Sequence, residues 1–237
     1  MSSVGLGCWQ LSGGEGMAGR YWPALGEETE RAVVRASLEA GVTWFDTAEF
    51  YGNGRSERAL ASALKAAGAA PGDVSIATKW MPFLRFAGNI RSTIGARLEA
   101  LGGFPIALHQ IHQRMSLSPV AAQMNAMADL VEAGSIRSVG VSNFGAGAMT
   151  AAHRALAERG IPLASNQMSY SLLDRRIERN GVLETARRLG VTIIAYSPLA
   201  QGALTGKFHG EAGKPVAVEG PRRIRRPFRP AALERSR

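Results

Sequence analysis

Cysteine, aromatic residues and long apolar runs are all scarce in this sequence. Of its 237 residues one is cysteine, Cys8, so no internal disulfide can form and a reducing compartment is expected. The first residues lack a basic segment followed by an apolar one, and no later run approaches the length of a membrane span. The composition is otherwise that of a globular protein, with 46% hydrophobic and 20% charged residues. We therefore expect a cytoplasmic protein without a membrane partner.

Acidic residues are also too few to balance the basic ones, and the formal net charge is +9. Seven arginines and a single glutamate fall within residues 222–237, so the rest of the chain is only mildly basic. Neither zinc-finger spacing nor an aromatic RNA-binding platform accompanies this charge, and no nucleic-acid partner is expected. The composition predicts one domain over residues 1–208 and a basic, poorly ordered tail over residues 209–237.

Short apolar or β-branched runs alternate along the chain with longer segments of helical period. The predicted strands are residues 3–7, 42–46, 74–79, 106–112, 136–142, 162–167 and 191–197. The predicted helical segments between them are residues 27–41, 55–68, 89–102, 118–134, 147–160 and 179–190. Each of these segments ends at a glycine that can adopt the left-handed conformation of a helix C-cap. This alternation predicts a parallel sheet with right-handed crossovers, either open and doubly wound or closed into a barrel.

The positions of the polar residues favour the barrel. Reactive side chains occur at the ends of many successive predicted strands, as in a (β/α)₈ barrel, where all these ends meet at one mouth. A doubly wound sheet would gather them at one switch point, and residues 5–14 lack the Gly-x-Gly-x-x-Gly spacing of a dinucleotide-binding turn. We therefore predict a (β/α)₈ barrel, of which about seven strands are present and the C-terminal part is incomplete.

A carboxylate at the end of an apolar strand needs a partner. Asp46 follows Val42, Trp44 and Phe45, and an unpaired buried carboxylate is costly. Lys79, at the end of the next strand, can form an ion pair with it, and Tyr51 and His112 share the same mouth. An ammonium group beside a phenol is expected to lower the tyrosine pKa from about 10, which makes Tyr51 a plausible general acid for carbonyl reduction.

Six sequence segments also resemble, in order, the signatures of the aldo-keto reductase superfamily. They are GVTWFDTAEFYGNGRSERALASALK, ATKW, LHQIH, VGVSNF, NQMSYSLLDR and AYSPLAQGALTGKF, and the resemblance extends from about residue 4 to residue 208. It implies a (β/α)₈ barrel that reduces aldehydes or ketones to alcohols with NADPH. It also implies that Asp46, Tyr51, Lys79 and His112 form a catalytic tetrad in which Tyr51 donates the proton.

The resemblance further assigns residues to the cofactor, NADP(H), and none to a metal ion. Ser142, Asn143 and Gln167 are expected to bind the nicotinamide carboxamide, Tyr196 to stack on the nicotinamide ring, and Ser197, Leu199, Gln201, Gly202 and Lys207 to lie along the pyrophosphate. Gly7, Cys8, Trp9 and Asp46 are expected to complete the cofactor site. His109, three residues before His112, is expected to face the other side of the sheet and to serve packing.

Two other interpretations remain open at this point. After Phe208 the chain lacks the eighth strand of the family pattern, so the first and seventh strands would be unpaired edges. The chain could then be a catalytically weak barrel fragment that binds a partner or nothing. Alternatively Lys79 could form a Schiff base, although a lysine paired with Asp46 stays protonated. Aromatic residues near the mouth, namely Tyr21, Trp22, Trp80, Phe83 and Phe86, suggest an apolar or aromatic carbonyl substrate.

Overall fold

The structure is a computed structural model that describes residues 1–208 and residue 228. Its strands are β1 (Leu6–Gly7), β2 (Trp44–Asp46), β3 (Ser75–Trp80), β4 (Ile106–Ile111), β5 (Val139–Ser142), β6 (Leu163–Ser169) and β7 (Thr192–Tyr196). Its α-helices are α1 (Gly16–Gly19), α2 (Glu27–Glu39), α3 (Arg55–Ala66), α4 (Gly88–Ala100), α5 (Val120–Glu132), α6 (Ala146–Ala157) and α7 (Val182–Leu189). Three short 3₁₀ helices are η1 (Trp9–Ser12), η2 (Arg176–Glu178) and η3 (Ala200–Thr205).

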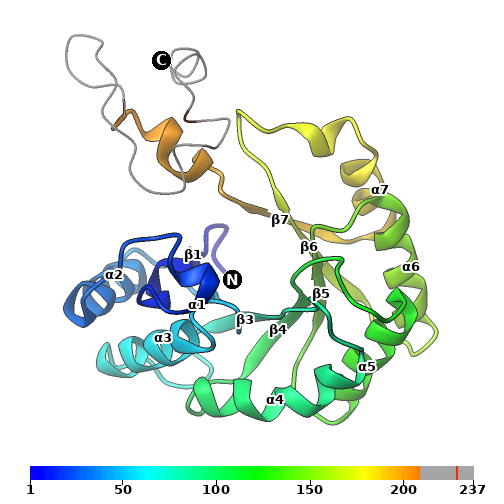
Figure 1. Cartoon of the computed structure of the whole chain (residues 1–237), viewed down its shortest axis with the longest axis horizontal. Coiled ribbons are helices and arrows are strands. Elements are labelled where there is room, and N and C mark those ends of the chain that lie inside the picture. Colours follow the sequence, from blue (N-terminus) through cyan, green and yellow to red (C-terminus); the bar gives the residue numbers. More distant parts are fainter. Residues whose placement is uncertain (209–227, 229–237) are drawn as a thin grey trace.

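The strands form one parallel sheet in the order of the sequence, from β1 to β7. Figure 1 shows the sheet curved around a centre, with α2 to α7 arranged on its outside. The predicted (β/α)₈ type of barrel is confirmed, and the described residues contain seven of its strands. Within the described residues β1 pairs only with β2 and β7 only with β6, so these two strands are the expected edges.

The glycines after the helices behave as predicted. All six have positive φ, from 56° at Gly102 to 79° at Gly68. In each case a residue with a side chain would be strained, and the chain turns there from the helix toward the next strand. The sequence did not predict η1 and α1, which lie between β1 and α2, because residues 9–19 are rich in glycine and show no helical period.

The main core lies between the outer face of the sheet and the helices. Residues that alternate with the interior positions pack there, including Phe45, Ile76, Ile111 and Val141, each fully buried. A separate, smaller cluster follows β7, where the Phe208 and Phe228 rings meet edge to face at 5.3 Å. Apart from Phe228, the predicted tail at 209–237 lies outside the described residues. No helix in the described part combines the length and apolar character needed to cross a bilayer.

Candidate active site

The register of the strands brings the predicted site residues to one side of the sheet. Asp46 lies opposite Gly7 and Ala77 on the neighbouring strands, and two residues after Ala77 on β3 comes Lys79, opposite Gln110. Because alternate residues of a strand share a face, these side chains and the later Ser142, Gln167 and Tyr196 all point into the barrel. These residues occupy alternating strand positions that face the barrel interior, which explains why residues far apart in the sequence meet at the carboxyl ends of the strands.

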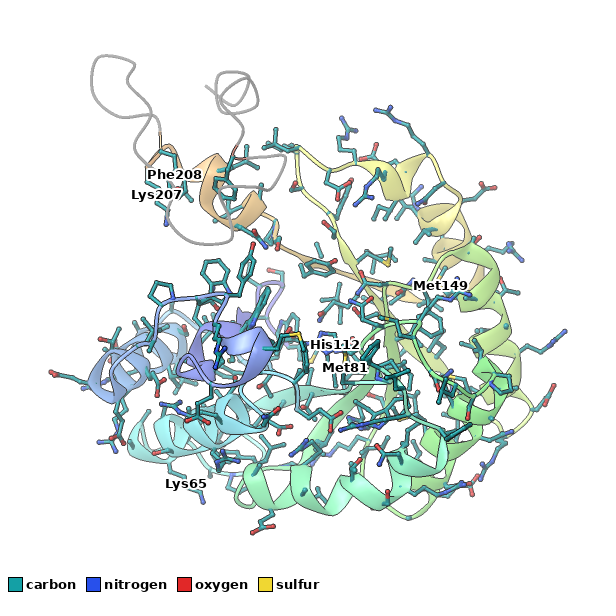
Figure 2. The ribbon with its side chains drawn as sticks, viewed as in Figure 1. Lys65, Met81, His112, Met149, Lys207 and Phe208 are labelled. Atoms are coloured by element: carbon teal, nitrogen blue, oxygen red, sulfur yellow. The ribbon has the colours of Figure 1, made fainter. Side chains whose placement is uncertain are left out.

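A cavity of about 600 Å³ opens at these ends. Figure 2 shows Met81 and His112 near the centre of the ring of strands, and Lys207 on the segment that follows β7. The predicted site residues that line the cavity are Gly7, Cys8, Trp9, Asp46, Tyr51, His112, Ser142, Asn143, Gln167, Tyr196, Ser197, Leu199, Gln201, Gly202 and Lys207. The remaining one, Lys79, is fully buried beneath the cavity floor and contacts Asp46.

Three side chains donate hydrogen bonds to the Asp46 carboxylate. The ammonium of Lys79 lies 2.5 Å from Oδ2, while the amides of Gln167 and Gln110 donate to Oδ1 at 2.9 and 3.3 Å. Lys79 donates a further bond to the carbonyl oxygen of Thr47 at 2.8 Å. The charge at the end of β2 is therefore neutralised by a buried cation and held by two amides, which explains how an acid can follow an apolar strand.

The electrostatics of Lys79 and Tyr51 correct one sequence-based expectation. Burial by itself lowers the pKa of Lys79, but Asp46 and Tyr51 outweigh it, so the net pKa is raised and the lysine stays protonated. Burial raises the pKa of Tyr51, and Lys79, whose Nζ lies 5.1 Å from the ring centroid, offsets this only in part. The expected lowering of the tyrosine pKa was therefore wrong in its net direction. The phenol remains protonated at neutral pH.

His109 on β4 and His112, which directly follows β4, lie on opposite sides of the sheet, as predicted. His112 lies in the cavity, and its ring meets the Tyr51 ring edge to face at 5.5 Å. Burial and the charge of Lys79 lower the pKa of His112 to about 3. His109 is buried on the opposite face, where burial lowers its pKa to about 4. Both imidazoles are therefore neutral at physiological pH, and His112 can donate or accept a hydrogen bond but cannot supply a proton as an imidazolium.

A polar wall is formed by the ends of β5, β6 and β7. Asn143 has a φ of 61°, a left-handed conformation that asparagine tolerates, and its side chain thereby turns into the cavity. Its Oδ1 accepts a hydrogen bond from the Tyr196 hydroxyl at 2.9 Å, and its Nδ2 donates to the Ser142 Oγ at 3.0 Å. Ser142 in turn donates to the Gln167 carbonyl oxygen at 3.0 Å. The wall thus combines amide donors, amide acceptors and a phenol ring.

An aromatic wall stands opposite, on the segment after β1. The Trp9 ring lies between Tyr21 and Tyr51, nearly parallel to both, with centroid distances of 4.8 and 5.6 Å. The Tyr21 hydroxyl donates to the Gln201 Oε1 at 2.7 Å and so links the segment after β1 to the segment after β7. Cys8 is buried beside this wall, and burial raises the pKa of its thiol, which makes it a poor nucleophile.

The expected set of mouth aromatics was wrong in part. Trp22 lines the cavity, whereas Trp80 is buried outside it with its indole bonded to Asn89 at 2.9 Å. Phe83 and Phe86 are exposed on the loop between β3 and α4 and do not line the cavity. The alternation of side chains along a strand could have excluded Trp80 from the cavity, because the residue after Lys79 must point to the opposite face of the sheet.

Sequence reasoning also missed residues that lie at the site. Gln110 was not singled out, although its position two residues before His112 places it in the barrel interior, where it contacts Asp46. Phe50, directly before Tyr51, and Met81, two residues after Lys79, line the cavity and add apolar surface. The two-residue alternation along β4 could have identified Gln110. The loop conformations that turn Met81 and Phe50 inward have no simple sequence signature.

Comparison with known proteins agrees with the fold. Residues 3–223 match the sequence model of the Aldo/keto reductase family, which is most of the chain. The chain belongs to the aldo/keto reductase family. An uncharacterized oxidoreductase of Mycobacterium tuberculosis is 39% identical over 221 residues, which cover 92% of this chain and 64% of the relative. The pyridoxal reductase of Arabidopsis thaliana is 32% identical over 220 residues, which cover 88% of this chain and 60% of that protein.

Solved structures of aldo-keto reductases show the same architecture. A thermostable aldo-keto reductase in complex with the inhibitor epalrestat superposes with a TM-score of 0.74 at 30% identity, covering 85% of this chain and 70% of that one. An aldo-keto reductase from Klebsiella pneumoniae in complex with NADPH gives a TM-score of 0.71 at 28% identity, covering 89% and 69% of the two chains. By the sequence comparisons, the chain spans less than two thirds of the length of the two curated relatives, the mycobacterial oxidoreductase and the pyridoxal reductase.

Proposed function

We propose that the chain is an NADP(H)-dependent oxidoreductase that reduces aldehydes or ketones to alcohols, with Tyr51 as the proton donor. The observation that carries the proposal is a protonated phenol in a cavity, next to a buried ammonium group and a neutral imidazole. A proton donor at the carbonyl oxygen is what reduction requires while hydride reaches the carbon. Membership of the aldo/keto reductase family and the NADPH-bound structural relative support the same reaction class.

The cavity residues fit the cofactor. A nicotinamide carboxamide needs both donors and acceptors, and Ser142, Asn143 and Gln167 offer both kinds of group on the polar wall. Tyr196 supplies a flat ring on the same side, and Lys207 supplies a cation for a phosphate at the rim. When bound, the cofactor supplies the hydride. We assign its binding to these residues together with Gly7, Cys8, Trp9, Asp46, Ser197, Leu199, Gln201 and Gly202.

In the proposed mechanism the protein orients the carbonyl and delivers one proton. Tyr51 donates its hydroxyl proton to the carbonyl oxygen, and the Lys79 ammonium stabilises the phenolate that is left. Asp46 keeps Lys79 charged and in place through the 2.5 Å contact. His112, neutral and facing Tyr51, hydrogen-bonds the carbonyl oxygen and holds it toward the phenol. The same protonated, paired state of Lys79 makes it a poor Schiff-base nucleophile, which argues against an aldolase-type reaction.

The substrate class follows from the rest of the lining. Trp9, Trp22, Phe50 and Met81 border the cavity beside Tyr51, and the exposed lining is mainly carbon. Such a surface favours carbonyl compounds with an apolar or aromatic substituent over highly hydrated sugars. We therefore propose small apolar or aromatic aldehydes and ketones as substrates.

Two measurements test this proposal. Titration of the chain with NADPH, followed by nicotinamide and protein fluorescence, should show saturable binding, and NADPH should be consumed on addition of an aromatic aldehyde. Tyr51→Phe should bind NADPH as the parent does and lose about 10²–10⁴-fold in turnover, the usual contribution of a general acid. Tyr170→Phe is the matched control, because Tyr170 bonds to Glu178 at 2.7 Å and does not line the cavity. Unchanged turnover in Tyr51→Phe would exclude the proposed acid.

A further inference from the structure

Two buried glutamates and one partly buried arginine lie next to the proposed catalytic residues but outside the cavity. Glu49 and Glu57 are 6% and 0% exposed, and the side chain of Arg97 is 12% exposed. We call these three residues the outer charge cluster. Glu49 belongs to the loop between β2 and α3, Glu57 to α3 and Arg97 to α4. Charged residues are rarely buried unless they are paired, and the proposed mechanism uses none of these three.

Glu49 is hydrogen-bonded to the end of β3, to the loop that follows it and to α4. Its Oε1 accepts hydrogen bonds from the Met81 amide and from the Arg85 guanidinium, each at 2.6 Å, and its Oε2 accepts one from Arg97 at 2.9 Å. Its own amide donates to the Lys79 carbonyl oxygen at 3.2 Å. Glu49 precedes Tyr51 by two residues, so these bonds fix the start of the segment that carries the proposed proton donor.

Arg97 extends the connection to the other catalytic strand. Its Nε lies 2.9 Å from the Glu57 Oε2, while the Glu57 Oε1 accepts a hydrogen bond from the Thr78 hydroxyl at 2.6 Å. Thr78 is the neighbour of Lys79 on β3 and points to the outer face of the sheet. One guanidinium therefore contacts two acidic side chains, one held to the loop of Tyr51 and the other to the strand of Lys79. Burial raises the pKa of Glu57 to about 7, although the charge of Arg97 acts to lower it.

The loop of Tyr51 needs such an anchor. Three residues that follow Tyr51 have positive φ, namely Gly52 at 66°, Asn53 at 51° and Gly54 at 84°. Glycine is the residue with the most backbone freedom to lose on folding, so this turn has little intrinsic preference for one conformation. Contacts from outside the turn therefore act together with its own backbone hydrogen bonds to fix the direction in which the tyrosine points.

We propose that Arg97 is a positioning residue for the reduction, which holds the Tyr51 loop and the Lys79 strand in the spacing that proton transfer requires, by bridging Glu49 and Glu57. The inference rests on the proposed function, since it concerns the same proton donor. Arg97 does not line the cavity and contacts neither substrate nor cofactor site. It acts through Glu49, Glu57 and Thr78, and a displacement of the phenol by about 1 Å can cost about 10²-fold in rate.

The test removes the bridge without leaving a buried charge unpaired. In the double variant Arg97→Met with Glu57→Gln, Thr78 keeps a hydrogen-bond acceptor and Glu49 keeps Met81 and Arg85. The control is Arg159→Met with Glu132→Gln, which removes a more exposed ion pair between the end of α5 and the turn after α6, at residues that do not line the cavity. Arg97→Lys should restore part of the activity, because a single ammonium group reaches one carboxylate at a time.

We expect the double variant to bind NADPH within about threefold of the parent, to keep its KM for the aldehyde, and to lose about tenfold or more in kcat. Amide hydrogen exchange in residues 48–54 should be faster in the double variant and unchanged in the control. Turnover within about twofold of the control, or a parallel loss of NADPH binding and folded signal, would overturn the proposal. If the parent neither binds NADPH nor reduces carbonyls, the proposed function fails, and unchanged exchange in residues 48–54 would then refute the anchoring as well.

Discussion

The ion pair between Asp46 and Lys79 predicts an asymmetric response to removal of either partner. Lys79 is fully buried, whereas the Asp46 side chain is 14% exposed and keeps two amide donors, Gln110 and Gln167, when the lysine is removed. Asp46→Asn removes the counter-charge and leaves the ammonium with two neutral hydrogen-bond partners, the Thr47 carbonyl oxygen and the Tyr51 hydroxyl. Breaking a buried pair by removing one partner costs about 3–5 kcal/mol, and we place Asp46→Asn at the upper end of this range.

Removal of the lysine should cost less. In Lys79→Met the Asp46 carboxylate remains hydrogen-bonded by two amides and partly hydrated, so we expect a loss of about 2–3 kcal/mol in the free energy of unfolding. The double variant Asp46→Asn with Lys79→Met leaves no buried charge at the pair and should be within about 2 kcal/mol of the parent. On these values the three variants form a double-mutant cycle with a coupling energy of at least about 5 kcal/mol.

The pH dependence of Asp46→Asn provides an independent check. Without the carboxylate, burial lowers the pKa of Lys79 in the folded state below its unfolded value of about 10.4, since burial is the largest influence on this group. A lowered pKa in the folded state means that the unfolded state binds more protons, so stability rises with pH in this window. Asp46→Asn should therefore be less destabilised at pH 9 than at pH 7.

Urea unfolding at pH 7 and pH 9, followed by circular dichroism and tryptophan fluorescence, measures these values. The chosen control is Arg31→Met, which removes an exposed ion pair with Glu27 on α2 and should cost no more than about 0.5 kcal/mol. Additive effects of Asp46→Asn and Lys79→Met, with a coupling energy below about 0.5 kcal/mol, would refute the view that each charge is stabilised by the other.

Two further predictions concern residues outside this pair. The folded-state pKa of His109 is about 4, so between pH 6.5 and 4 the unfolded state binds a proton that the folded state does not, and stability falls as the pH falls. His109→Leu should therefore reduce the loss of stability over this range by about 3 kcal/mol in acid unfolding curves. An unchanged curve would contradict the buried, neutral state of His109. Tyr21→Phe removes the 2.7 Å hydrogen bond to Gln201 and should weaken NADPH binding about 3–10-fold in fluorescence titrations, with kcat within about twofold of the parent. Equal affinity in the variant would show that this hydrogen bond does not contribute to cofactor binding.

Periodicity was sufficient for much of the architecture. The alternation of short apolar runs with helical segments fixed the strand order, and the glycines after the helices marked where each helix ends, because a left-handed residue is a local backbone requirement. Asp46 could be paired with Lys79 because parallel strand ends meet at one edge. The short 3₁₀ helices after β1 and β7 could not be predicted. Their conformations depend on contacts between distant segments, such as the hydrogen bond from the Tyr21 hydroxyl to Gln201.

Electrostatics was the part of the site that the sequence described least well. The direction of the Tyr51 pKa depends on the balance between burial and the charge of Lys79, and a sequence shows the charge but not the burial. Similarly, Trp80 was expected at the mouth, yet as the residue after Lys79 on β3 it faces the outside of the sheet and lies in the core. The outer charge cluster is invisible to motif reading, because Glu49, Glu57 and Arg97 come from three separate elements.

The balance at Tyr51 also bears on the direction of catalysis under the proposed function. Burial raises the pKa of Tyr51 and outweighs Lys79, which lowers it more than Asp46 raises it, so the proton stays on Tyr51 at neutral pH. A protonated phenol is ready to donate, whereas oxidation of an alcohol requires the phenolate to accept a proton. The raised pKa of Tyr51 therefore favours reduction at neutral pH and shifts alcohol oxidation to alkaline pH, where the phenolate becomes populated.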